Sequence, residues 1–192
     1  MRDPGPGVSP GRPPVQQLGP DWVPGEDGMP FRRGARVLLF DEEDRVLLVR
    51  GHDQDQPERT WWFTVGGGID PGESPRQAAV RDVREETGLQ LDPDGLLGPV
   101  AERTAVFDFL RQAVRQHELF FVARVARPGA LSHEGWTAVE RSFMDEARWW
   151  HLEDLGRSDL EIFPSELVSL ASGLLAGWDG AVRQLVEQRR VR

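Results

Sequence analysis

The stretch that decides the fold and the chemistry is residues 67–89, GGIDPGESPRQAAVRDVREETGL. Ser74 is a preferred N-cap residue, with a glutamine three positions later to complete a capping box. Pro75 suits the first helical position, where a missing N–H costs nothing. Gly88 can adopt the left-handed conformation that commonly ends a helix. The stretch therefore predicts a helix from about Pro75 to Thr87.

Three acidic side chains of this helix fall at helical spacing. Asp82 is three residues before Glu85 and four before Glu86, so all three project from one side. Like charges at these spacings destabilise an isolated helix by roughly 0.2–0.5 kcal/mol per pair, so the crowding indicates a bound divalent cation. We expect this acidic face to look away from the small apolar stripe that packs on a sheet, namely Ala78, Ala79, Val80 and Val83.

Glycines directly before the helix suit the same chemistry. Gly66, Gly67 and Gly68 have no side chains, so backbone there can approach a metal or a phosphate closely. Mg²⁺ takes oxygen ligands and is usually held by a few carboxylates together with substrate phosphates. Carboxylates, a cation and bare backbone together favour phosphoryl chemistry, in which the cation neutralises developing charge.

Residues 67–89 resemble the Nudix box, G-x5-E-x7-R-E-U-x-E-E-x-G-U, in which U is aliphatic. The matching positions are Gly67, Glu73, Arg81, Val83, Glu85, Glu86, Gly88 and Leu89. Asp82 departs from the pattern because the family has glutamate there. The wider layout of residues 34–155 also resembles the family.

The resemblance implies roles for individual residues. The metal ligands for Mg²⁺ or Mn²⁺ would be the Gly66 carbonyl, Asp82, Glu85 and Glu86. Glu85, Glu86, Arg81 and Glu73 would form the catalytic group, with Arg81 orienting the Glu73 carboxylate. The general base would be a glutamate of the helix or one on a later loop, where Glu134 and Glu140 lie and Glu140 is favoured.

The function implied is Mg²⁺-dependent hydrolysis of a phosphoanhydride bond by attack of a metal-activated water on phosphorus. The substrates would be nucleoside diphosphate-linked compounds or nucleoside triphosphates. Asp82 keeps open an alternative, a Nudix-like domain that binds or senses a nucleotide with little hydrolysis. A related isomerase activity on isopentenyl diphosphate would use a catalytic cysteine, and the chain has none.

Substrate selection lies outside the box. Arg36 flanks the first predicted strand and Arg50 ends the second, and arginine forks suit phosphates. Trp62 could stack on a nucleobase, with packing in the core as the alternative.

The fold expected is α/β (α+β), a Nudix-like α/β/α sandwich around a mixed β-sheet. Beyond the box helix, the pattern predicts strands at 34–41, 45–50, 61–65, 98–109, 117–126 and 141–150, and helices at 151–155 and 165–176. Residues 1–30 hold eight of the fifteen prolines and are expected to form a flexible arm. The hydrolase domain would span 31–176, followed by a helical tail over 177–192, amphipathic from about 178 to 191.

Composition limits the partners. The net charge of −9 disfavours long nucleic acids, because affinity for them depends on neutralising phosphates. The absence of a long apolar run and of cysteine favours a soluble, cytoplasmic protein with no membrane partner and no disulfides. The expected partner is a small nucleotide-type substrate, and a homodimer is compatible with the resemblance.

Overall fold

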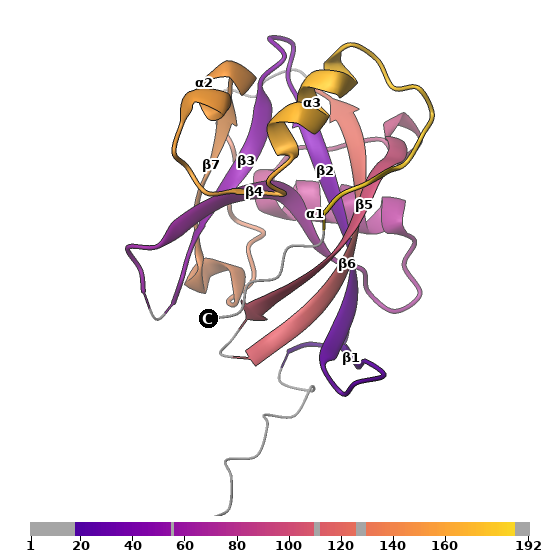
Figure 1. Ribbon diagram of the computed structural model, residues 1–192, viewed down its shortest axis with the longest axis vertical. Coiled ribbons are helices and arrows are strands. Elements are labelled where there is room, and N and C mark those ends of the chain that lie inside the picture. The colour runs from indigo at the N-terminus through magenta and orange to yellow at the C-terminus, as the bar shows by residue number, and fades with distance from the viewer. Residues whose placement is uncertain (1–17, 55, 110–111, 126–129, 187–192) are drawn as a thin grey trace, which may run out of the picture.

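A computed structural model describes residues 18–54, 56–109, 112–125 and 130–186. In Figure 1, one long helix lies behind a β-sheet and two shorter helices lie in front of it. The helices are α1 (Pro75–Thr87), α2 (Leu152–Arg157) and α3 (Leu167–Leu175), with short 3-10 turns η2 (Pro93–Gly95) and η3 (Glu140–Ser142). The strands are β1 (Val23–Pro24), β2 (Pro30–Phe40), β3 (Val46–His52), β4 (Thr60–Gly68), β5 (Leu97–Phe109), β6 (Gln112–Arg124), β7 (Met144–Trp150), β8 (Ile162–Phe163) and β9 (Arg183–Gln184).

The described strands form one mixed sheet in the order β7-β3-β4-β2-β6-β5-β9. β1 pairs with β2 and β8 pairs with β4, both outside that order. β2 runs parallel to β6 but antiparallel to β4, which places β4 and its glycines beside the centre of the sheet. The expected mixed sheet between layers of helices is therefore confirmed, and so is the α+β class.

Two apolar clusters hold the layers together. Under α1, small side chains such as Ala79 and Val83 pack on Val37 and Val65 of the sheet. On the opposite face, α2 and α3 cover residues such as Phe40 and Trp62 with leucines that include Leu167. Burial of apolar area of this kind is the main favourable contribution to folding, at about 25 cal/mol per Å².

Helix α1 begins and ends where its local signals predict. Ser74 accepts a hydrogen bond from the backbone N–H of Gln77, whose side chain accepts in return from Ser74 N–H. Gly88 closes the helix in the left-handed conformation, with φ of 76°. The expected direction of the acidic face is wrong, however, since Asp82 and Glu86 are buried on the same side as Ala79 and Val83. Residues three and four apart share a helix face, so carboxylates at these positions follow the apolar stripe toward the sheet.

The N-terminal segment from residue 18 packs on the domain. Leu18 and Trp22 are buried against Val114 of β6, and Phe107 and Phe109 of β5 border the same cluster. β1 then pairs with the start of β2, which begins four residues earlier than the pattern predicts. Residues 18–30 are therefore draped on the sheet, and the rest of the expected arm, 1–17, lies outside the described residues.

The expected C-terminal helix is wrong over the part of the tail that the structure describes. Residues 177–186 are extended, and β9 pairs parallel with Ala101 and Glu102 at the edge of β5. Gly177 and Gly180 have φ of 123° and 85°, conformations that end a helix. The open edge of β5 then offers backbone partners to the chain beyond them, and the rest of the expected helix, 187–191, is not among the described residues.

None of the helices in the described ranges combines the length and the apolar character needed to cross a bilayer.

Candidate active site

The acidic half of α1 lies directly over the glycines at the end of β4. Glu86 Oε2 accepts a hydrogen bond from the Gly66 N–H at 3.3 Å. A Cβ at Gly67 would lie 3.2 Å from Asp82 Oδ2, so the absence of a side chain there lets the helix carboxylate approach the strand. Gly66 itself has φ of 127°, and a Cβ there would clash with the Ala35 carbonyl. Gly67 therefore allows the close approach of the carboxylate, and Gly66 allows the strand conformation beside it.

Burial changes the charge of both inward carboxylates. Desolvation raises the pKa of Asp82 to about 7, although Arg81 and Arg36 act in the opposite direction. Burial, and then the neighbouring Asp82, raise the pKa of Glu86 well above its usual range. Glu140 adds to the negative potential at both groups. Protein cations alone therefore leave this pair undercompensated.

Arg81 organises the outer side of the same cluster. Its Nε and Nη2 donate to the two oxygens of Glu73 at 3.0 and 2.9 Å, a bidentate pair. Its Nη1 donates to Asp82 Oδ1 at 2.5 Å and lies 3.4 Å from Glu85 Oε2. These hydrogen bonds lower the pKa of Glu73 and raise that of Arg81. The structure thus places Arg81 on Glu73, as the resemblance implies.

The donor set suits a hard divalent cation. Asp82 Oδ2 is buried without a hydrogen-bond partner, next to Glu86, and a cation would satisfy this oxygen. No three Asp, Glu or His side chains of the described residues are close enough as they stand to hold a metal ion. Arg81 binds Asp82 Oδ1 and the Gly66 N–H binds Glu86 Oε2, while Glu85 is half-buried at the edge of the helix. The oxygen donors present are therefore of the type that a hard divalent cation binds. The Glu85 side chain would have to turn inward to complete the group of ligands.

A loop over residues 130–143 covers the end of α1. Trp136 Nε1 donates to the Glu86 carbonyl at 3.0 Å, and Ser132 N–H donates to the Thr87 carbonyl at 3.0 Å. Gly135 lies against the Glu85 backbone so closely that a Cβ would clash with it. Glu140 lies on this loop, and its charge acts on Asp82 and Glu86. Its carboxylate, however, accepts hydrogen bonds from Thr137 N–H and Oγ1 at 2.7 and 2.8 Å. Glu134 is exposed on the same loop.

Arg36, expected to bind substrate, lies in a buried polar network. Its Nε donates to Glu118 Oε1 at 2.8 Å, while Nη1 donates to the carbonyls of Thr64 and Gly66. Arg103 donates to the other oxygen of Glu118 at 2.5 Å. Burial would raise the pKa of Glu118, but Arg103 and Arg36 outweigh it and lower the pKa to about 2.

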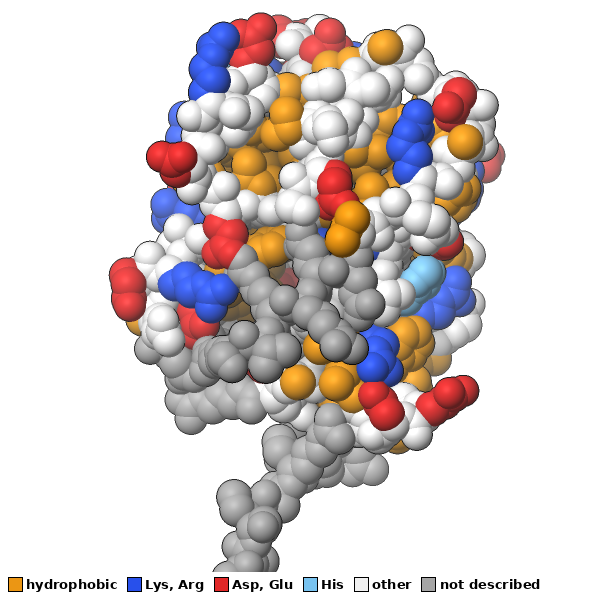
Figure 2. Space-filling model, viewed as in Figure 1, with side chains coloured by type: hydrophobic (Ala, Val, Ile, Leu, Met, Phe, Trp, Pro, Cys, Tyr) orange, Lys and Arg blue, Asp and Glu red, His pale blue; other side chains and the backbone are white. Residues whose placement is uncertain are grey.

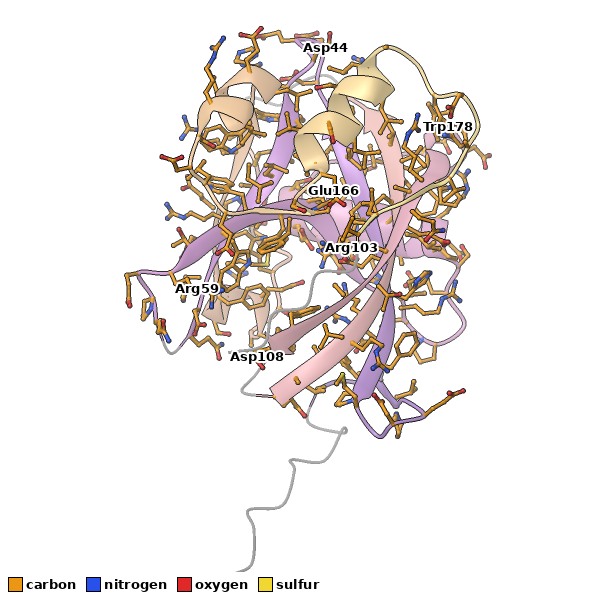
Figure 3. The ribbon with its side chains drawn as sticks, viewed as in Figure 1. Asp44, Arg59, Arg103, Asp108, Glu166 and Trp178 are labelled. Carbon is orange, nitrogen blue, oxygen red and sulfur yellow. The ribbon has the colours of Figure 1, made fainter. Side chains whose placement is uncertain are left out.

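Figure 3 places Glu166, directly before α3, beside Arg103 on β5, so this network faces the α3 side of the sheet.

The other two residues expected to bind substrate are not at the carboxylates. Trp62 is 3% exposed and lies edge-on to Trp150, with ring centroids 5.0 Å apart. Alternation along β4 turns it toward α2 and α3, so the interpretation as core packing is correct and stacking on a base is not. Arg50 lies on β3 and pairs with Asp145 and Glu146 of β7 at 3.3 and 3.0 Å.

Sequence reasoning missed Glu118 and two of its partners, Gln116 and Arg103. Gln116 and Glu118 occupy inward positions of β6 between Val114 and Phe120. Polar side chains at the core positions of an alternating strand are the signal that could have identified them. Arg103 was not foreseeable, because its role depends on the pairing of β5 with β6.

Comparison with known proteins identifies the family of the chain. The family described as NUDIX domain matches residues 30–170. The chain is 36% identical over 67 residues to the RNA pyrophosphohydrolase of Bartonella bacilliformis (strain ATCC 35685 / KC583 / Herrer 020/F12,63), covering 32% of this chain and 39% of the relative. It is 43% identical over 70 residues to diphosphoinositol polyphosphate phosphohydrolase 3-alpha of Homo sapiens, covering 35% and 40%. The matches thus span about two fifths of each relative.

A solved structure supports the same fold. The NUDIX domain of Shewanella oneidensis NrtR, crystallised with ADP ribose, has a TM-score of 0.54 and 21% identity, covering 74% of this chain and 87% of that one. The family match spans most of the chain and includes the whole carboxylate cluster. The chain therefore belongs to the Nudix family.

Proposed function

We propose that this protein hydrolyses a phosphoanhydride bond in a nucleoside diphosphate-linked compound or a nucleoside triphosphate, with Mg²⁺ or Mn²⁺ as cofactor. The observation that carries the proposal is the buried Asp82–Glu86 pair beside the Gly66 N–H, in which Asp82 Oδ2 has no partner. Strongly perturbed carboxylates that converge on bare backbone are typical of functional sites.

Each residue then has a defined task. Asp82, Glu85, Glu86 and the Gly66 carbonyl would hold the cation, which supplies charge neutralisation at phosphate and activates a water. Arg81 fixes Glu73 through two hydrogen bonds and keeps the outer carboxylates in place. The water oxygen forms a bond to phosphorus, the bridging P–O bond breaks, and the leaving phosphate departs.

A carboxylate must accept the proton of the attacking water. Glu85 is half-buried at the open edge of the cluster, where it could do so. Glu140 is the alternative base, and Thr137 would have to release its carboxylate. Titration of activity in Glu85→Gln and Glu140→Gln separates them, because loss of the base removes the acidic limb of the pH–rate profile.

The names of the relatives support hydrolysis of a phosphoanhydride bond but do not agree on one substrate. Their names specify RNA and diphosphoinositol polyphosphates, and the solved domain holds ADP ribose. In Figure 2, acidic, basic and hydrophobic side chains are interspersed over the described part of the α2–α3 face, which favours a small ligand over a long nucleic acid there. The proposal includes action in the cytoplasm, where nucleotides and Mg²⁺ are available, and gel filtration would test for a homodimer.

A second candidate function is nucleotide sensing with weak hydrolysis. Asp82 favours it, since this side chain is one methylene shorter than the family's glutamate and Arg81 holds its Oδ1 at 2.5 Å. Asp82→Glu separates the two functions. A sharp rise in rate indicates a weakened catalyst, whereas tight nucleotide binding without turnover in either variant supports a sensor.

The experiment that tests the proposal is product identification on a panel of nucleoside triphosphates, nucleotide sugars and dinucleoside polyphosphates. Each is incubated with Mg²⁺, with Mn²⁺ and with chelator. Metal-dependent cleavage supports the hydrolase, and the products identify the bond. Glu153→Gln on α2 is the matched control, because its carboxylate is exposed and far along the chain from the cluster. Absence of cleavage throughout, with folded protein, would overturn the proposal.

A further inference from the structure

Arg36 joins the two buried carboxylate groups of the molecule. Its Nη1 donates to the Gly66 carbonyl, the backbone oxygen expected to bind the cation. Its charge also acts on Asp82 and Glu86, at which it is one of the few favourable protein charges. Arg36 is therefore the protein cation that faces the proposed metal ligands from the side of the sheet.

Glu118 and its hydrogen-bond partners fix the position of the Arg36 guanidinium. Glu118 accepts from Arg36 Nε at 2.8 Å and is itself held by Arg103 and by Gln116 at 2.5 and 2.7 Å. The Thr64 carbonyl accepts from Nη1 at 3.2 Å. A guanidinium bound through Nε to a buried carboxylate has its remaining donors directed forward, in this case toward the carbonyls of β4.

A guanidinium and a divalent cation would compete for the same oxygen. The Gly66 N–H is already used by Glu86, so the carbonyl of this residue is its remaining polar group. A dication on that carbonyl would lie next to the positive charge of Arg36, and like charges at such distances repel strongly where water is excluded. Occupation by one cation therefore opposes occupation by the other.

We propose that Arg36 is a placeholder cation: it holds the Gly66 carbonyl and compensates Asp82 and Glu86 until a divalent cation takes over both tasks. Arg36 thereby sets the metal affinity of the site. The inference rests on the proposed function, since it requires a divalent cation at Gly66, Asp82 and Glu86. Arg36 acts as a positioning residue, through the carbonyl and the carboxylates.

The chain offers a matched control. Arg103 and Arg36 each donate Nε to Glu118, so replacing either one removes a buried guanidinium from the same carboxylate. The Gly66 carbonyl accepts a hydrogen bond from Arg36, whereas Arg103 reaches Glu118 from β5. A general loss of stability should affect both variants, whereas a change in metal affinity should be confined to Arg36.

The test is calorimetric titration of Mn²⁺ into metal-stripped full-length protein, without substrate. We expect Arg36→Gln to tighten Mn²⁺ binding by about 10-fold, equivalent to about 1.4 kcal/mol. Arg103→Gln should change it less than about 2-fold, within ordinary experimental scatter. Unchanged or weaker binding in Arg36→Gln, or equal tightening in Arg103→Gln, would overturn the placeholder.

Two further measurements keep the outcome decisive. If Arg36→Gln does not fold, Arg36→Met replaces it, because an unbranched apolar side chain removes both the positive charge and the hydrogen bond to the carbonyl. Tighter binding in that variant supports the inference, and unchanged or weaker binding overturns it. Wild-type protein that fails to bind Mn²⁺ overturns the proposed metal site as well, whereas wild-type binding with no effect of Arg36 overturns this inference alone.

Discussion

Two buried carboxylate sites, separated by one arginine, have pKa values shifted in opposite directions. Asp82 and Glu86, on α1, are 5% and 2% exposed, and their pKa values are raised. Glu118, on β6, is 1% exposed, and its pKa is lowered to about 2. Burial alone therefore does not determine whether a carboxylate is charged.

The difference lies in the partners. Glu118 accepts from Arg36, Arg103 and Gln116, which satisfy its oxygens and neutralise its charge. Asp82 and Glu86 repel each other, and Asp82 Oδ2 has no partner. We call a buried carboxylate saturated when protein groups bind its oxygens and neutralise its charge, and disrupting such a site destabilises the fold. An unsaturated carboxylate, which lacks such partners, is available to a ligand at a cost in stability.

The largest expected effect is at the saturated site. Glu118→Gln keeps the size of the side chain but removes the buried charge that Arg36 and Arg103 both bind, which should lower the free energy of unfolding by about 3–5 kcal/mol. Urea denaturation at neutral pH measures it. The exposed Glu153→Gln should stay within about 0.5 kcal/mol of wild type. A loss below about 1 kcal/mol in Glu118→Gln would show that the network is not essential.

Substitution at the unsaturated site should affect chemistry instead of folding. Glu86→Gln is expected to lower turnover by at least about 100-fold, the scale of a single catalytic group. The unfolding midpoint in chelator should be unchanged or higher, because burial and Asp82 both disfavour the charged form of the carboxyl group that the amide replaces. Initial rates in Mg²⁺ and urea denaturation test both parts. Near-normal turnover would remove Glu86 from the proposed site.

The pH dependence of stability should have opposite signs at the two sites. In chelator, folded Asp82 keeps its proton to about pH 7, whereas the unfolded chain releases it near 3.8. Its contribution to the free energy of unfolding therefore falls as pH rises from 3.8 to 7, by up to about 1.4 kcal/mol per pH unit. The contribution of Glu118 is complete above 4.5 and is lost as pH falls toward 2.

Urea denaturation between about pH 2 and 7 measures these contributions in wild type, Asp82→Asn and Glu118→Gln. Subtracting the free energy of unfolding of each variant from that of wild type gives the contribution of Asp82 or of Glu118. The wild-type-minus-Asp82→Asn curve should descend between pH 4 and 7 and then become flat. A curve without slope in that window would place the Asp82 pKa near its ordinary value and end the contrast between the sites.

The smallest effect is expected at an exposed ion pair. Arg50, 38% exposed, pairs with Asp145 and Glu146, so Arg50→Gln should change the free energy of unfolding by about 0–1 kcal/mol. Thermal unfolding at low and high salt measures it. If Arg50 also binds substrate phosphate, as the sequence predicts, KM should rise while the unfolding transition stays in place.

Local signals predicted the parts of this site that depend on neighbours in the chain. Ser74, Pro75 and Gly88 determine the ends of α1, and the structure has them at the expected residues. The contact of Arg81 with Glu73, which the resemblance implies, likewise joins residues close in the chain. Such contacts form within a few turns, so short sequence patterns contain the information.

Contacts between distant segments were not predictable in this way. The C-terminal tail reads as an amphipathic helix, yet the described part of it pairs with β5, whose open edge no local pattern reveals. Trp62 could have faced either side of β4 until the sheet assigned it to the core under α2 and α3.

The sequence by itself determined the helix, its caps and the carboxylates that it carries. Only the tertiary structure decided that Asp82 and Glu86 turn inward onto Gly66 and that Arg36 lies between them and Glu118. The reason is physical: helix spacing is set by neighbouring residues, whereas burial and charge compensation depend on strands brought together from far apart in the chain.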